Sequence, residues 1–214
     1  MVGQDMPNCR VMPVPDRTRA QVKLNDAMAA LRLGQVARAE RLLKGVLRTA
    51  PRHFDALMML GALQGRQGRF DDAAMLFSRA VEARPVDADA HYNLGLALGQ
   101  VETSDRPIAC YRQALAINPR HLGAANNLAA ELVARERWEE ALRHLKPARA
   151  QHPDDPQLLC KSGIALKETG RFDEAVAALQ QAVQKLPNDA GIHANLGLVL
   201  RNLGDLGVVT QFEI

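Results

Sequence analysis

The chain has 214 residues, of which 47% are hydrophobic and only 4% aromatic, so it is long enough to bury a sizeable core. Leu and Ala dominate the hydrophobic residues and runs of β-branched residues are scarce, which favours helices over strands. The 27 basic and 24 acidic residues are interspersed, without the basic stripe and stacking aromatic residues of a nucleic-acid binder, so no nucleic-acid partner is expected.

Residues 1–19 precede any repeating pattern and are expected to form a flexible tail. Asp5, Arg10 and Asp16 fall where a signal peptide needs an apolar stretch, so no such peptide is expected. The chain also lacks a run of about 18 apolar residues that could span a bilayer. We therefore expect a cytoplasmic protein that does not insert into a membrane.

The chain repeats itself with a period of 34 residues from residue 20 onward. Five prolines mark the period: Pro51, Pro85, Pro119, Pro153 and Pro187. When each proline is numbered 32 within its unit, the units begin at residues 20, 54, 88, 122, 156 and 190. Prolines at such regular spacing end the second of two helices in each unit. The sequence therefore predicts a repeat array over residues 20–203.

Small and large apolar residues recur at fixed positions of each unit, with helical spacing. Position 8 is always small and predicts a close crossing of the two helices: Ala27, Gly61, Gly95, Ala129, Gly163 and Gly197. Position 24 carries a larger apolar side chain in the second helix: Leu43, Phe77, Tyr111, Leu145 and Leu179. Position 15 is predicted to end the first helix with a positive φ at four glycines: Gly34, Gly68, Gly170 and Gly204.

Two prolines depart from this pattern. Pro107 is tolerable only if its helix starts near Ser104, so that the ring lies in the first turn. Pro147 falls in the middle of a predicted helix, where a lost hydrogen bond and a ring clash predict a local bend.

Segments such as AHYNLGLALGQ and GRFDEAVAALQQAVQKLP resemble tetratricopeptide repeats, over about residues 20–203. This resemblance implies an all-α fold, a right-handed α-α superhelix of about five and a half helix-turn-helix units. It also implies that the first helix of each unit lines a concave face. Residues 204–214 are left for a truncated last helix, which either caps the array poorly or marks a fragment of a longer chain.

No residues are expected to form a catalytic or metal site. No phosphate-binding loop, dinucleotide fingerprint, nucleophile elbow or HExxH motif occurs. His53 shares a repeat position with His121, as His91 does with His193, and a solenoid keeps equivalent positions of distant units apart. The three cysteines are odd in number and far apart: Cys9, Cys110 and Cys160. We expect no metal, no cofactor and no enzymatic activity.

Position 6 of the first helix carries the feature with most functional content. Its residues are expected to contact a bound peptide: Asn25, Met59, Asn93, Asn127, Lys161 and Asn195. Asparagine is a poor helix former, and its amide can donate to and accept from a peptide backbone. The alternative is that asparagine is common at this position whatever the ligand. The groove is expected to continue at Leu96, Gln100 and Ile164.

This asparagine ladder is similar to the one in O-linked N-acetylglucosamine transferases, although no catalytic domain follows it here. Chaperone-binding tetratricopeptide domains hold a C-terminal carboxylate with basic residues at positions 2 and 6. Position 6 matches in part, but position 2 carries Asp89, Gly123 and Gln157, so that specificity is not expected.

The sequence thus predicts a non-enzymatic adaptor or scaffold that binds a protein or peptide in its concave groove. Two alternatives stay open. The array could be the substrate-recruiting region of a larger enzyme, such as a glycosyltransferase. It could also be a self-assembling scaffold, a homo-oligomer formed through its C-terminal end.

Overall fold

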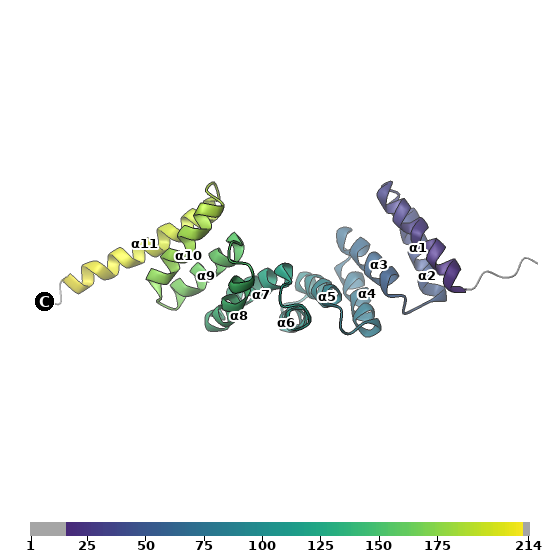
Figure 1. Ribbon diagram of the computed structural model, residues 1–214, viewed down its shortest axis with the longest axis horizontal. Helices are drawn as coiled ribbons and strands as arrows, with labels where there is room; N and C mark the ends of the chain where they lie inside the picture. The colour runs from purple at the N-terminus through teal and green to yellow at the C-terminus, as the bar shows by residue number, and fades with distance from the viewer. Residues whose placement is uncertain (1–15, 212–214) are drawn as a thin grey trace, which may run out of the picture.

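The computed structural model describes the backbone of residues 16–211 and the side chains of residues 19–204. Within this range the chain is all-helical, and eleven helices follow one another along the long axis of the molecule (Figure 1). Their bounds are α1 Asp16–Arg32, α2 Val36–Thr49, α3 Phe54–Arg66, α4 Phe70–Ala83, α5 Ala88–Val101, α6 Arg106–Ile117, α7 Leu122–Ala134, α8 Trp138–Gln151, α9 Pro156–Glu168, α10 Phe172–Lys185 and α11 Ala190–Gln211.

Each helix packs against the next one in the chain, and α9 also contacts α7 and α11. The odd-numbered helices from α3 onward begin at residues 54, 88, 122, 156 and 190, which open the units defined by the proline spacing. The first helix differs, because α1 begins at Asp16 and so includes residues that we assigned to the tail. Most of that predicted tail lies outside the described residues.

The predicted close crossing at position 8 is confirmed at Gly61, Gly95 and Gly163 but not at Gly197, where an added Cβ atom would meet nothing within 4 Å. A Cβ atom built on Gly61, Gly95 or Gly163 would lie 2.8, 2.7 or 2.4 Å from the nearest side-chain atom. The atoms met belong to the position-24 residues of the same units: Phe77, Tyr111 and Leu179. Only glycine allows this approach, because a methyl group would overlap the buried side chain.

The first helices α3, α5, α7, α9 and α11 each have the same kind of N-terminal cap. The side chain at position 34 of the preceding unit accepts a hydrogen bond from the third backbone N–H of the following helix. These caps are His53, Asp87, His121, Asp155 and Asp189. In His53 and His121 the acceptor is the ring Nδ1, so both histidines have a structural role that explains their shared repeat position.

The turns at position 15 follow the prediction at three of the four glycines. Gly34, Gly68 and Gly170 have φ of 69°, 76° and 75°. Glu136 takes the equivalent place between α7 and α8 with φ 56°, a conformation that is strained for a residue with a side chain. Gly204 was wrongly predicted to separate two helices, because α11 runs through it without a turn. The predicted last helix is thus part of α11 up to Gln211, and residues 212–214 lie outside the described range.

Both unusual prolines lie in helices. Pro107 is in the first turn of α6, where no backbone N–H is needed, as predicted. Pro147 is inside α8, which continues on both sides of it, and its side chain is exposed. The local bend at Pro147 stays a prediction.

The core runs through the array as a chain of apolar clusters between neighbouring helices. Alanines at position 20 are fully buried and let the helices approach: Ala39, Ala73, Ala141 and Ala175. Trp138 packs against the cluster around α7 and α8, as its position at the start of α8 predicts. Cys110 and Cys160 are free and half-buried, and burial raises the pKa of both thiols. Cys9 lies outside the described residues.

Candidate functional site on the first helices

The surface formed by α1, α3, α5, α7, α9 and α11, here called the first-helix face, carries all the residues predicted to contact a peptide. Position 6 places one of them on each of these helices. Asn25 is exposed, and the other five are half-buried. Two pockets open on this face, and they bring together six of the nine predicted residues.

The first of these, the α9 pocket, lies between α7, α9 and α11 and has a volume of about 350 Å³. Three predicted residues line it: Lys161, Ile164 and Asn195. Its apolar wall comes from Val133 of α7 and Ile192 of α11, among others. The pocket therefore combines an apolar surface with a few polar groups, the composition that suits recognition of a side chain.

Lys161 is the basic group of the α9 pocket, whose lining also includes the acidic Asp189. Its Nζ donates to Gln157 Oε1 at 2.9 Å and to Asn126 Oδ1 at 3.3 Å. Burial lowers the pKa of Lys161 below its ordinary value. Both acceptors are neutral amides, and no carboxylate of a described residue forms an ion pair with this ammonium group. A carboxylate that entered the pocket would thus meet a positioned, unpaired cation.

Asn195 lies opposite Lys161 on α11. Its Nδ2 makes a weak contact with Cys160 Sγ at 3.8 Å. Because sulfur is a poor acceptor, most of the hydrogen-bonding capacity of this amide is left for a ligand. Cys160 itself lines the pocket as an apolar group.

The second, the α5 pocket, lies between α3, α4 and α5 and has a volume of about 490 Å³. It is lined by the predicted residues Asn93, Leu96 and Gln100. Asn93 Nδ2 donates to the carbonyl of Asp89 in its own helix at 2.8 Å. The Asn93 carbonyl oxygen and its second N–H stay available to a peptide. Arg66 adds a positive charge at the rim of this pocket.

The remaining three predicted residues line neither pocket. Asn25 accepts a hydrogen bond from Gln21 on the exposed surface of α1. Met59 packs against the core between α1 and α4. Asn127 lies near Tyr111, whose pKa is raised chiefly by burial. That these three residues contact a peptide stays a prediction.

Sequence reasoning missed part of the α9 pocket. Val133 reaches it from position 12, Gln157 from position 2 and Asp189 from the loop before α11. Positions 2 and 12 lie on the same side of a helix as positions 6 and 9, so helical periodicity was the signal that could have found two of them. Asp189 belongs to a loop, and only the packing of α11 brings it to the pocket.

Two further observations bear on the chemistry of the described residues. No group of three or more His, Cys, Asp or Glu side chains among them is arranged to hold a metal ion. None of the helices that the structure describes has the length and apolar character to cross a membrane.

Family models match most of the array. Models described as tetratricopeptide repeat match residues 30–95, 88–121 and 121–150, and one described as TPR repeat matches residues 163–204. Comparison with curated proteins yields no match.

Solved structures share the fold at low sequence identity. A structure of MamA protein is 22% identical with a TM-score of 0.72, and the match covers 78% of this chain and 91% of that one. A tetratricopeptide repeat protein from Parabacteroides merdae is 17% identical with a TM-score of 0.74, covering 87% of this chain and 74% of that one. YrrB, described as a TPR protein with an unusual peptide-binding site, is 17% identical with a TM-score of 0.72, covering 85% and 97%. Family models, helix pattern and fold agree, and the chain belongs to the tetratricopeptide repeat family.

Proposed function

We propose that the protein is a non-enzymatic adaptor that holds an extended segment of a partner protein against its first-helix face. The α9 pocket is the observation that carries this proposal. It joins Lys161, Ile164 and Asn195 of two consecutive units around one cavity. An apolar side chain of the segment would enter the pocket, while the Asn195 amide binds the peptide backbone and Lys161 takes a carboxylate.

The α5 pocket extends the same surface toward the N-terminus. Asn93 and Asn195 both occupy position 6, three units apart, and each lies at a pocket with free hydrogen-bonding capacity. A segment that spans both pockets would be anchored at two points. The membership of the chain in a family of interaction modules, and the peptide-binding site named for YrrB, agree with such a role.

The partner segment can be identified by cross-linking. A photoreactive benzoylphenylalanine at Ile164 should cross-link the segment in cell extract, whereas the same residue at the exposed Ala177 of α10 should not. The cross-linked segment, made as a synthetic peptide, then allows affinity measurements on purified protein.

The affinity test compares asparagines that differ only in position. Asn93→Ala combined with Asn195→Ala should weaken peptide binding by roughly five- to hundredfold, since each lost hydrogen bond contributes about 0.5 to 1.5 kcal/mol. Asn188→Ala, in the exposed loop before α11, is the matched control and should leave the affinity unchanged. The proposal fails if the double variant binds the peptide as tightly as the wild type.

A second function, self-association through α11, is favoured by one observation. Leu200 is 49% exposed, although its equivalents Leu98, Leu132 and Leu166 are at most 5% exposed. A second copy that covers α11 would bury this leucine. Leu200→Gln should then convert a dimer to a monomer in light scattering, while Leu33→Gln, which changes another exposed leucine, should not. A wild-type protein that is monomeric at high concentration would refute this function.

A further inference from the structure

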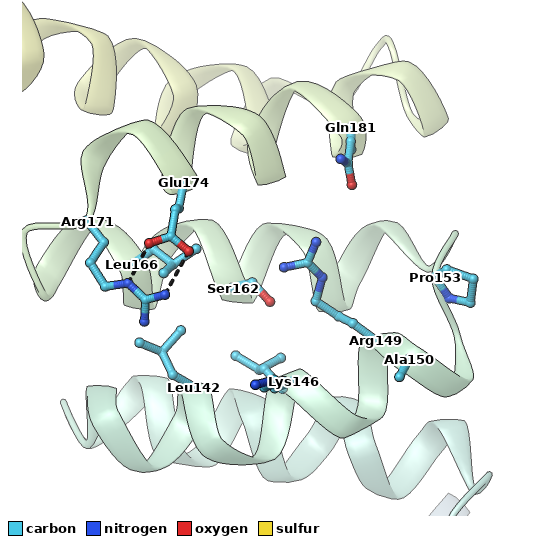
Figure 2. Close-up of a pocket in the computed structure, with 11 residues that line it drawn as sticks. Leu142, Lys146, Arg149, Ala150, Pro153, Ser162, Leu166, Arg171, Glu174 and Gln181 are labelled. Carbon is cyan, nitrogen blue, oxygen red and sulfur yellow. Dashed lines mark hydrogen bonds and ion pairs between the residues drawn. The ribbon is translucent and has the colours of Figure 1, made fainter.

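The opposite surface, formed by the second helices, carries a groove that the first-helix face does not explain. It lies between α8 and α10 above α9 and has a volume of about 510 Å³. Figure 2 shows Arg149 reaching from α8 across this groove, with Ser162 of α9 at its floor and the Arg171 and Glu174 pair at its border. We call it the α8/α10 groove.

The α8/α10 groove holds an excess of positive charge. Arg171 is neutralised by Glu174, to which its Nε and Nη2 donate at 2.8 and 2.7 Å. Lys146 and Arg149 have no such partner, since neither forms an ion pair or a hydrogen bond with another described side chain. Arg149 is half-buried, and its guanidinium has no acceptor among the described side chains.

The rest of the lining is apolar apart from Ser162 and Gln181. Leu142 and Leu145 of α8 and Leu166 of α9 form the surface beneath the two cations. The buried Ser162 hydroxyl donates to the carbonyl of Leu158 at 2.8 Å and carries no charge, so it does not neutralise the cations. A ligand that satisfies this groove therefore presents carboxylates beside an apolar side chain.

The same chemistry occurs in a second groove, between α2 and α4 above α3, here called the α2/α4 groove. It has a volume of about 700 Å³ and its lining includes four cations and one anion: Arg41, Lys44, Arg48, Arg79 and Asp72. Lys44 and Lys146 both occupy position 25 of their units. Lys44 differs from Lys146 in forming an ion pair with Glu40 at 2.7 Å. Arg41 and Arg48, like Arg149, form no ion pair with a described side chain.

The contact between α6 and α8 shows how such cations can be satisfied internally. There the position-25 residue is Arg112, and it forms an ion pair with Glu140 at position 19 of the next unit. The corresponding acidic residue of the α8/α10 groove is Glu174. It pairs with Arg171, as Glu140 pairs with Arg137, but it forms no ion pair with Lys146 at position 25. The cations of the α8/α10 groove are thus left for an external anion.

We propose that the α8/α10 groove, and with it the α2/α4 groove, binds an acidic amphipathic segment of a partner protein. Charge complementarity selects the carboxylates, and the leucine floor selects the apolar side chain between them. Neither groove has an aromatic side chain in its lining on which a base could stack. An acidic protein segment therefore fits better than a nucleic acid.

The probe for the test is a 14-residue helical peptide of Leu and Glu, with a Leu and Gln peptide of the same pattern as the neutral control. Isothermal titration of the full chain should give two equivalents of the acidic peptide bound, and the neutral peptide should bind at least tenfold more weakly. Arg149→Glu should remove one equivalent, and Arg48→Glu should remove the other.

Arg143→Glu is the matched control, since it makes the same charge change on an exposed residue of α8 outside the groove. It should leave both equivalents in place. Equal losses from Arg143→Glu and Arg149→Glu would overturn the proposal, because they would indicate binding to net charge alone. Tighter binding of a single-stranded oligonucleotide or of anionic vesicles than of the acidic peptide would overturn it too. If the wild type binds only one equivalent of the acidic peptide and Arg149→Glu abolishes it, the proposal is refuted for the α2/α4 groove alone.

This inference is independent of the proposed adaptor function, and the experiment separates the two. Asn93→Ala with Asn195→Ala should leave binding of the acidic peptide unchanged, because both residues lie on the first-helix face. If that double variant loses the acidic peptide while Arg149→Glu retains it, the acidic segment binds on the first-helix face, and the second-helix grooves are refuted. Circular dichroism confirms that each variant is folded.

Discussion

The crossing of α9 and α10 allows a sharp test of the packing. Gly163 is buried, and a Cβ atom there would lie 2.4 Å from Cγ of Leu179 and 2.9 Å from its Cδ2. Carbon atoms in contact are normally about 3.5 to 4.0 Å apart, so Gly163→Ala forces a shift of about 1 Å. Leu179 is fully buried and cannot swing away into solvent. The two helices must therefore move apart.

The magnitude follows from two opposing effects. Overpacking costs about 1 to 3 kcal/mol, and the severe overlap places this site at the upper end. Alanine regains about 1 kcal/mol because it is the better helix former. Gly163→Ala should therefore destabilise the protein by about 2 kcal/mol, which lowers the melting temperature by about 4 to 8 °C.

Thermal unfolding followed by circular dichroism measures this effect. Gly45→Ala is the matched control, because Gly45 is also a buried helical glycine but its added Cβ would meet only ordinary contacts at 3.8 and 3.9 Å. That variant should be stabilised by about 1 kcal/mol. Leu179→Ala, which makes room, should reduce the cost of Gly163→Ala when the two are combined. Melting temperatures that shift in the same direction for Gly163→Ala and Gly45→Ala would refute the reasoning.

Two further predictions concern single side chains. Glu136→Gly should raise the free energy of unfolding by about 1 kcal/mol in denaturant titration, because φ of 56° is strained for glutamate. Gly68→Ala at the equivalent turn should lower the free energy of unfolding. A Glu136→Gly variant less stable than wild type, or a Gly68→Ala variant more stable than wild type, would contradict this view of the turns. The pKa of Glu40 is lowered by its hydrogen bonds, first from Lys44 and then from Arg69. At pH values above 4.5, the ordinary pKa of glutamate, the ionised Glu40 therefore stabilises the fold. This stabilisation is lost as the pH falls through the lowered pKa of Glu40. Glu40→Gln should thus destabilise the protein by about 0.5 to 1 kcal/mol at pH 7, and the difference from wild type should vanish in acid unfolding; a difference that grows at low pH would refute it.

The helical pairs could be recognised from the sequence because their signals are local. A proline every 34 residues ends each second helix, and glycines such as Gly68 and Gly170 take the positive φ that the turn requires. The small residue at position 8 predicted a close crossing, since two helix axes can approach closely only where one residue has little or no side chain. Each of these features depends on the backbone preferences of a few consecutive residues.

The site was predictable only in part. Helical periodicity places Lys161, Ile164 and Asn195 on one side of the array, and the structure brings them to one pocket. Periodicity gives a face and not a partner, so it could not show that Lys161 donates a hydrogen bond to Asn126 of the preceding unit.

What only the tertiary structure decided depends on contacts between units and on side-chain conformations. Three observations depend on which rotamer a side chain adopts beside its neighbour. They are the helix caps at His53 and His121, the ion pair of Arg112 with Glu140, and the unpaired Arg149. The uninterrupted α11 belongs here as well, because Gly204 ends a helix only where a following helix packs back against it. Local sequence sets where a helix of this protein can end, and the packing of the neighbouring unit decides whether it does.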